Sequence, residues 1–206
     1  MSIRSAGGFR CTITGSNDSG SQMENAKKVE RYNNVAIAFH WVVAVGVFVM
    51  IGLAWYMTEI PKGAPSRGFF FNLHKSIGLT LGIIVLLRAY WRWKHPAPPL
   101  PPGTPSWIVN ASRLSHGLLY ALLVFMPIVG FIASNFTKYG VTYFGLFKIG
   151  PFFGENKTMY DLFQGFHQAA ATVLVAVVVI HVAAALKHLL IDRDGVFYRM
   201  LPGGRS

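Results

Sequence analysis

The chain has 206 residues, of which 52% are hydrophobic and 13% are charged. A soluble globular domain usually has about a quarter charged residues, so this composition excludes an ordinary soluble domain and is typical of a membrane protein. The formal net charge is +11, from 19 Lys and Arg against 8 Asp and Glu. In a membrane protein such an excess is expected on cytoplasmic loops and at anionic headgroups, so we expect no nucleic-acid partner.

The first 22 residues are rich in Ser, Gly and Thr and contain no apolar run. They predict a disordered tail rather than a secretory signal or a membrane span. The ordered domain is expected to extend over residues 23–206. The single cysteine, Cys11, cannot form an internal disulfide, and the chain has no Cys-x-x-Cys-His motif for covalent attachment of a c-type haem.

Four apolar segments are long enough to cross a bilayer, which takes about 20 residues. Three of them contain no charged residue, namely Val35–Thr58, Leu114–Thr137 and Leu162–Leu186. The fourth, Phe69–Trp93, has basic residues only towards its two ends, where long side chains can reach the interfaces. The linker between the second and third segments, HPAPPLPPGTP, has too many prolines to be helical. The sequence predicts an all-α membrane protein, a bundle of four transmembrane helices.

Basic residues are more frequent on the side of this bundle that would hold both termini. The positive-inside rule then predicts that both termini are cytoplasmic. The loops on the opposite side, called the outer loops below, still have a net positive charge from Lys62, Arg67, Lys75, Lys138, Lys148 and Lys157 against Glu59, Glu155 and Asp161. A basic surface attracts small anions, although a modest excess of charge on loops is also ordinary.

Histidines are the most informative polar residues of the apolar segments. Of the seven histidines, all but His95 of the proline-rich linker lie in these segments or at their ends. His95 is expected to be a solvated loop residue. A polar ring inside a bilayer needs a partner in the bundle interior and is a functional-site hypothesis by default.

Two histidine pairs are predicted at two depths of the membrane. His167 and His181 are fourteen positions apart, which places both rings on one helix face and separates them by about 21 Å. His74 is expected at the depth of His167, and His40 at the depth of His181. The pairs suit bis-histidine ligation of two b-type haems, an arrangement that favours one-electron transfer over oxygen binding.

Other interpretations remain open at this point. Small residues such as Gly78 and Gly82 fit a flat cofactor but also ordinary close helix packing. The histidines could instead be hydrogen-bonded packing residues or line a proton path. His116 is a rival ligand on the inner side or a contact of a quinone or a haem propionate, and His188 is expected to reach the headgroups. Pro127 predicts a kink and a quinone cleft in the third helix.

Several motifs, taken together in this order, resemble the bacterial cytochrome b561 family. They are AFHW (38–41), NLHKSIG (72–78), LLRAYWRWKHPAPP (86–99), HGLLYALLVFMPIVGF (116–131), GFHQAAA (165–171) and IHVAAALKH (180–188). The resemblance covers residues 23–206. It implies a four-helix bundle with two b-type haems that exchanges electrons with ubiquinone in the bacterial inner membrane. Some members are similar to superoxide oxidases, in which superoxide at the outer face passes an electron through haem to quinone.

This resemblance suggests two functions. The first is an oxidoreductase that transfers electrons from superoxide, or another periplasmic donor, to ubiquinone through haems held by His40, His74, His167 and His181. The second is a cytochrome b anchor subunit that relays electrons between a periplasmic dehydrogenase or hydrogenase and the quinone pool. A metal or proton transporter is disfavoured, because the four apolar segments contain no carboxylate.

Overall fold

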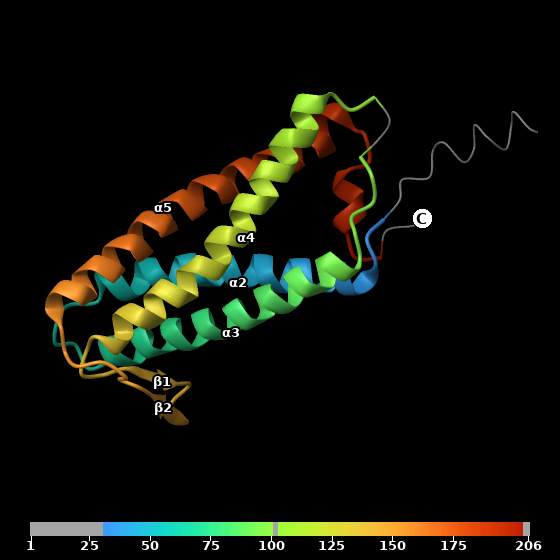
Figure 1. Cartoon of the computed structure of the whole chain (residues 1–206). Coiled ribbons are helices and arrows are strands. Elements are labelled where there is room, and N and C mark those ends of the chain that lie inside the picture. The colour runs from blue at the N-terminus through green and yellow to red at the C-terminus, as the bar shows by residue number, and fades with distance from the viewer. Residues whose placement is uncertain (1–30, 101–102, 204–206) are drawn as a thin grey trace, which may run out of the picture.

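The computed structural model describes residues 31–100 and 103–203. This part of the chain forms four long helices, α2 (Asn34–Glu59), α3 (Arg67–Lys94), α4 (Ser106–Asn135) and α5 (Lys157–Lys187). Each helix is long and apolar enough to cross a membrane. Figure 1 shows the four helices as one elongated bundle. The prediction of an all-α, four-helix membrane fold is confirmed.

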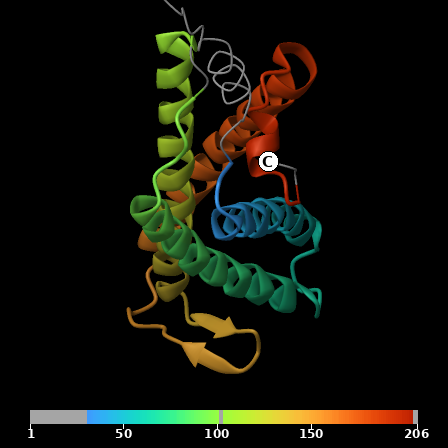
Figure 2. The same cartoon turned by 90° about the vertical axis from the view of Figure 1, so that its right-hand side faces the viewer.

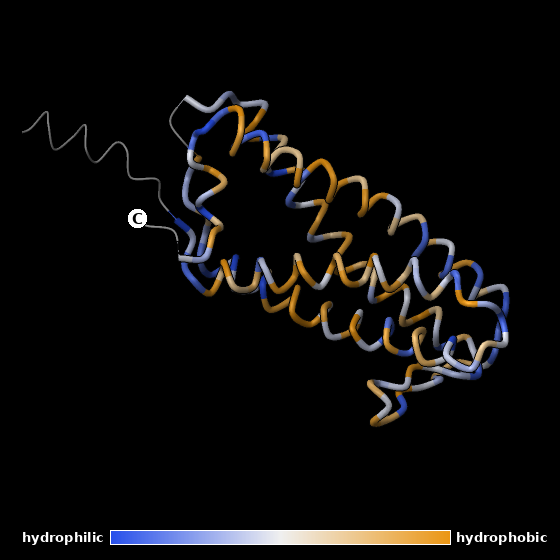
Figure 3. The backbone as a smooth tube through the Cα atoms, turned by 180° about the vertical axis from the view of Figure 1, so that it is seen from behind, coloured by the Kyte–Doolittle hydropathy of each residue, from blue (hydrophilic) through white to orange (hydrophobic). Residues whose placement is uncertain are grey.

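The helices expose apolar side chains outwards, as expected where the solvent is lipid. Large exposed residues occur along every helix, including Phe48, Ile83, Phe125 and Val179. Figure 3 shows hydrophobic residues along the length of the bundle and hydrophilic residues gathered towards its two ends. This distribution defines a membrane-spanning middle.

Neighbouring helices pack through small residues. α2 packs on α3, α3 on α4, and α4 on α5. A Cβ atom at Gly82 of α3 would lie 2.9 Å from Pro127 Cγ of α4, and one at Gly46 of α2 would lie 2.8 Å from Leu81 of α3. Glycine at these positions allows the backbones to approach closely. The small interior cluster around Val43, Val47 and Val85 lies between these helices.

A short β-hairpin marks one end of the bundle, called the hairpin end below. Its strands β1 (Val141–Tyr143) and β2 (Phe147–Ile149) are antiparallel, with Val141 opposite Ile149. Seen along the bundle, the hairpin projects sideways beyond α3 (Figure 2). From the sequence, this segment was counted only among the outer loops. The strands are too short for an alternating pattern to reveal them, and polar side chains of α3 hold them in place.

Both ends of the described chain lie at the opposite end of the bundle, called the terminus end (Figure 1). Beyond α5 the chain forms η1 (His188–Asp192), a π-helix, and η2 (Phe197–Met200), a 3₁₀-helix. The indole nitrogen of Trp41 donates to the carbonyl of Met200 at 2.7 Å, which ties the start of α2 to the end of the chain. The predicted tail, residues 1–22, and the predicted domain start at residue 23 lie outside the described residues.

Candidate functional site

The first histidine pair lies towards the hairpin end. The rings of His74 on α3 and His167 on α5 have centroids 6.2 Å apart and planes 75° apart. Nδ1 of His167 lies 3.1 Å from the backbone carbonyl of Met126 on α4. A carbonyl only accepts, so Nδ1 carries the proton and Nε2 is left free as an acceptor or ligand. The close approach of α4 depends on Gly130, where a Cβ would lie 3.1 Å from the His167 ring.

The second pair lies towards the terminus end. The rings of His40 on α2 and His181 on α5 have centroids 6.4 Å apart and planes 65° apart. His116 of α4 lies closer still to His181, with ring centroids 5.3 Å apart. Nδ1 of His116 lies 2.7 Å from the carbonyl of Ser112, which fixes that ring against its own helix. The structure therefore brings together both predicted pairs and also the rival residue His116.

The spacing of the rings distinguishes these contacts. An imidazole nitrogen binds a transition metal at about 2.0–2.1 Å, so two rings on opposite sides of one metal have centres roughly 6.3 Å apart. The separations of 6.2 Å and 6.4 Å in the two predicted pairs fit this arrangement. The separation of 5.3 Å between His116 and His181 is too short for it.

Two of the rings also have a buried nitrogen without a partner. Nδ1 of His40 and Nδ1 of His74 are buried, and no group in the described part of the chain bonds to them. Most buried polar atoms in native proteins are satisfied. Buried nitrogens without a partner inside a membrane bundle indicate that the described residues alone do not complete these sites.

A cation accompanies each pair. Nζ of Lys75, the neighbour of His74, donates to the carbonyl of Gly140 at 2.9 Å, just before β1. At the other site, Nε of Arg88 on α3 donates to the hydroxyl of Tyr120 on α4 at 3.1 Å. In the sequence, Arg88 is one of the basic residues towards the end of the segment Phe69–Trp93. Its contact with Tyr120 depends on how α3 and α4 pack, which the sequence does not reveal.

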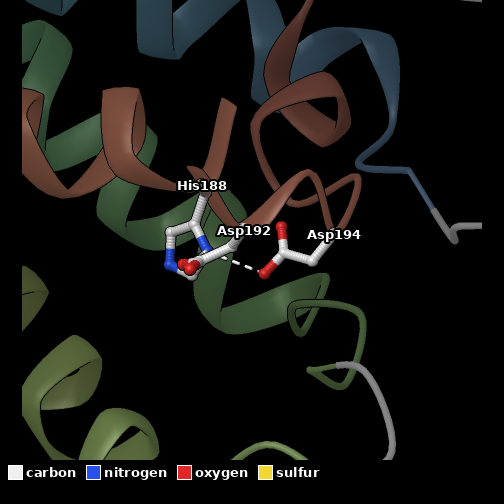
Figure 4. A group of neighbouring side chains, drawn as sticks. All are labelled: His188, Asp192 and Asp194. Carbon is white, nitrogen blue, oxygen red and sulfur yellow. Dashed lines mark hydrogen bonds and ion pairs between the residues drawn. The ribbon is translucent and has the colours of Figure 1, made fainter. Parts of the chain in front are cut away.

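Beyond the second pair, three side chains form a charged cluster, drawn in Figure 4. Nδ1 of His188 lies 2.7 Å from Asp194 and 3.3 Å from Asp192. Lys187 bonds to both carboxylate oxygens of Asp192, at 2.5 and 2.7 Å. The sequence pointed to His188 but not to the two aspartates. The π-helix η1 changes the helical spacing that would have related His188 to Asp192.

The charged cluster borders a cavity of about 280 Å³ at the terminus end. The cavity combines apolar with charged lining: its residues are Leu100, Gly103, Thr104, Pro105, Ile108, Lys187, His188, Asp192, Asp194 and Val196. His95 directly follows α3. Its side chain is exposed and stacks on Trp91, with ring centroids 4.1 Å apart. It takes part in neither histidine pair.

Comparison with known proteins identifies the family. The sequence profile described as prokaryotic cytochrome b561 matches residues 31–203. Cytochrome b561 homolog 2 of Escherichia coli is 33% identical over 176 residues, which cover 84% of this chain and 92% of that protein. Cytochrome b561 homolog 1 of the same organism is 23% identical over 174 residues, covering 84% and 98%. A Yersinia pestis protein named probable superoxide oxidase CybB is 26% identical over 180 residues, covering 86% and 99%.

The match extends over nearly all of the described chain and includes all four spanning helices. The chain is therefore a multi-pass bacterial membrane protein that belongs to the prokaryotic cytochrome b561 family, whose members carry electrons across the membrane with b-type haem.

Proposed function

We propose that the chain is a superoxide:ubiquinone oxidoreductase. It takes single electrons from superoxide at the hairpin end, which faces the periplasm, and delivers them to ubiquinone at the terminus end, in the cytoplasmic half of the membrane. The observation that carries the proposal is the presence of two histidine pairs, at 6.2 Å and 6.4 Å, with one member of each on α5. The name of the Yersinia pestis relative supports superoxide as the donor.

The four histidines would hold two haem irons: His74 and His167 would hold one, and His40 and His181 the other. When bound, b-type haem would supply a one-electron couple. The hydrogen bond from His167 Nδ1 to the Met126 carbonyl keeps Nε2 free for the metal and fixes the orientation of the ring.

The hairpin end is suited to an anionic donor. The outer loops are net positive, and a surface of this charge raises the encounter rate with a small anion such as superoxide. One of these cations, Lys75, lies next to His74 in the chain, in the partly buried region under β1. Superoxide loses one electron there and leaves as O₂.

The terminus end is suited to a quinone. Ubiquinone needs two electrons and two protons to become ubiquinol, so two superoxide ions are oxidised for each ubiquinol formed. The cavity of about 280 Å³ has apolar lining for a ring and polar side chains for its two carbonyl oxygens. His188, hydrogen-bonded to Asp194, is a group that can hold a proton at this cavity.

The proposal is tested on detergent-purified protein, in one cuvette. A reduced-minus-oxidised visible spectrum with haem quantitation is expected to show two low-spin b haems per chain. Addition of a superoxide source should then reduce the haems, and a soluble ubiquinone should reoxidise them. Superoxide dismutase, added beforehand, is the control that should abolish haem reduction.

Other results contradict parts of the proposal. Two haems that ignore superoxide but are reduced by an added periplasmic dehydrogenase would identify a relay subunit instead. A preparation without haem would contradict electron transfer itself and return attention to a transport role for the histidines.

A further inference from the structure

Arg88 is a cation inside a membrane-spanning helix, and the described residues provide no carboxylate for it. It lies on α3, one turn after the buried Val85. Its Nε donates to the Tyr120 hydroxyl at 3.1 Å, and its guanidinium carbon lies 5.5 Å from the centre of that ring. A guanidinium has five N–H donors, and in residues 31–100 and 103–203 no second acceptor bonds to it. A charge in this position requires an anion.

The side chain is directed into the bundle. Its hydrogen-bond partner Tyr120, one turn after His116 on α4, packs against the interior cluster of Val43, Val47 and Val85. Val43 of this cluster lies one turn after His40 on α2. Arg88 therefore lies beside the histidine pair of the terminus end, and the anion that it requires belongs to that region.

Basic residues further along α3 are arranged differently. The guanidinium of Arg92, one turn on, lies 5.1 Å from the ring centre of Tyr32, close to the start of α2. Nζ of Lys94 lies 4.7 Å from the ring of the exposed Trp93. These side chains lie at the end of the bundle, where lipid phosphates and water are within reach. Arg88 differs from them because its partner, Tyr120, packs on the interior cluster.

We infer that Arg88 binds a propionate carboxylate of the haem held by His40 and His181, and that it raises the reduction potential of this haem. The inference rests on the haem arrangement proposed above. A b-type haem carries two propionates, and a carboxylate matches the planar fork of a guanidinium in charge and geometry. Reduction of the iron adds one electron, so a nearby cation stabilises the reduced form. An electron is thereby drawn towards the terminus end.

A redox titration of the purified, haem-loaded protein tests this inference. The Arg88→Gln change is made in the wild-type chain and in a His74→Ala background, where the remaining haem is the one in question. We expect its reduction equilibrium constant to fall by about tenfold, which is 59 mV for a one-electron couple. Arg88→Lys keeps the charge without the fork and should recover part of the shift. Lys94→Gln, on the same helix, is the matched control and should leave the potential unchanged.

The outcomes separate this inference from the proposed function. The role of Arg88 is overturned if Arg88→Gln keeps the wild-type potential, or if Lys94→Gln shifts the potential equally. Either result indicates a lipid phosphate as the anion of Arg88. If Arg88→Gln does not retain haem, Tyr120→Phe is titrated instead. This substitution should also lower the reduction potential, but by less. An unchanged potential in Tyr120→Phe overturns the inference. Neither superoxide nor quinone takes part in the titration, whereas fewer than two low-spin haems in the wild-type chain would contradict the haem arrangement itself.

Discussion

At the scale of single residues, the orientation of the His167 ring depends on a different helix from the one that carries it. His167 is carried by α5, but its Nδ1 bonds to a carbonyl of α4 and its ring lies against Gly130 of α4. A hydrogen bond from the other ring nitrogen fixes the tautomer of a histidine ligand and its direction towards a metal. Substitutions on α4 are therefore expected to affect a site to which α4 contributes no ligand.

Substitution of single histidines should divide them into two pairs. His74→Ala and His167→Ala should each lose the same haem, and His40→Ala and His181→Ala should each lose the other, because a haem with one protein ligand is bound weakly. Haem quantitation with low-temperature spectra distinguishes the two losses. His116→Ala should retain both haems. If it instead loses the haem that His181→Ala loses, His40 is not the ligand at the terminus end.

Gly130→Ala should perturb the haem of the hairpin end. The added Cβ would lie 3.1 Å from the ring of His167, so the ring or the helix must shift. We expect reduced occupancy or an altered spectrum of that haem, with the other haem unchanged. Gly117→Ala lies on the same helix and meets nothing within 4 Å, so its spectrum should match that of the wild type. An unchanged spectrum in Gly130→Ala would show that α4 gives way at this contact.

At the scale of elements, the hairpin is held by side chains of α3. The fully buried Ser76 accepts from the backbone nitrogen of Phe144 at 2.9 Å and donates to the carbonyl of Asn72 at 2.8 Å. The Asn72 side chain in turn accepts from the backbone of Thr142 at 3.3 Å. These contacts attach the hairpin to the turn of α3 that carries His74.

Ser76→Ala is expected to destabilise the protein by about 1–3 kcal/mol, because the backbone nitrogen of Phe144 loses its acceptor. The measurement is thermal unfolding in detergent, followed by haem absorbance. Thr172→Ala on α5 is the control. Its hydroxyl also bonds to a carbonyl four residues earlier, but the residue is exposed and holds no other element, so we expect little change. Equal effects of the two substitutions would contradict a specific role of Ser76.

The sequence predicted the four helices but not the contacts between them. Apolar runs without charge located all four helices, but α4 begins at Ser106, eight residues before the apolar run at Leu114, because polar residues continue the helix beyond its apolar part. Helical periodicity predicted that His167 and His181 share one face, and in the structure each ring lies near a histidine of another helix. It could not reveal that His116 approaches His181 or that Arg88 meets Tyr120, since these contacts depend on how separate helices pack.

At the scale of the whole molecule, the bundle has two different ends. One carries the hairpin and the other carries both ends of the described chain, the charged cluster and the cavity. Transfer of electrons from one end to the other moves charge across the membrane. In the proposed function, the orientation of the bundle therefore decides on which side superoxide is consumed.

The orientation is tested with one accessible thiol. Leu146, at the hairpin turn, is 77% exposed, and the chain has a single cysteine, so Cys11→Ser with Leu146→Cys leaves one thiol in a known place. In intact spheroplasts a membrane-impermeant maleimide should label this protein. In inverted vesicles it should label only after detergent is added. The reverse pattern would place the hairpin end in the cytoplasm and contradict superoxide capture from the periplasm.

One continuous helix carries a histidine of both pairs. The distance between the pairs is therefore set by fourteen helical rises along α5, about 21 Å, and not by the packing of one helix on another. A thinner bilayer, a higher temperature or weaker packing of a neighbouring helix would tilt or shift α5 as a unit and leave its length unchanged. The rate at which electrons tunnel falls steeply with distance, so a backbone of fixed pitch would make electron transfer between the two proposed haems insensitive to the state of the membrane.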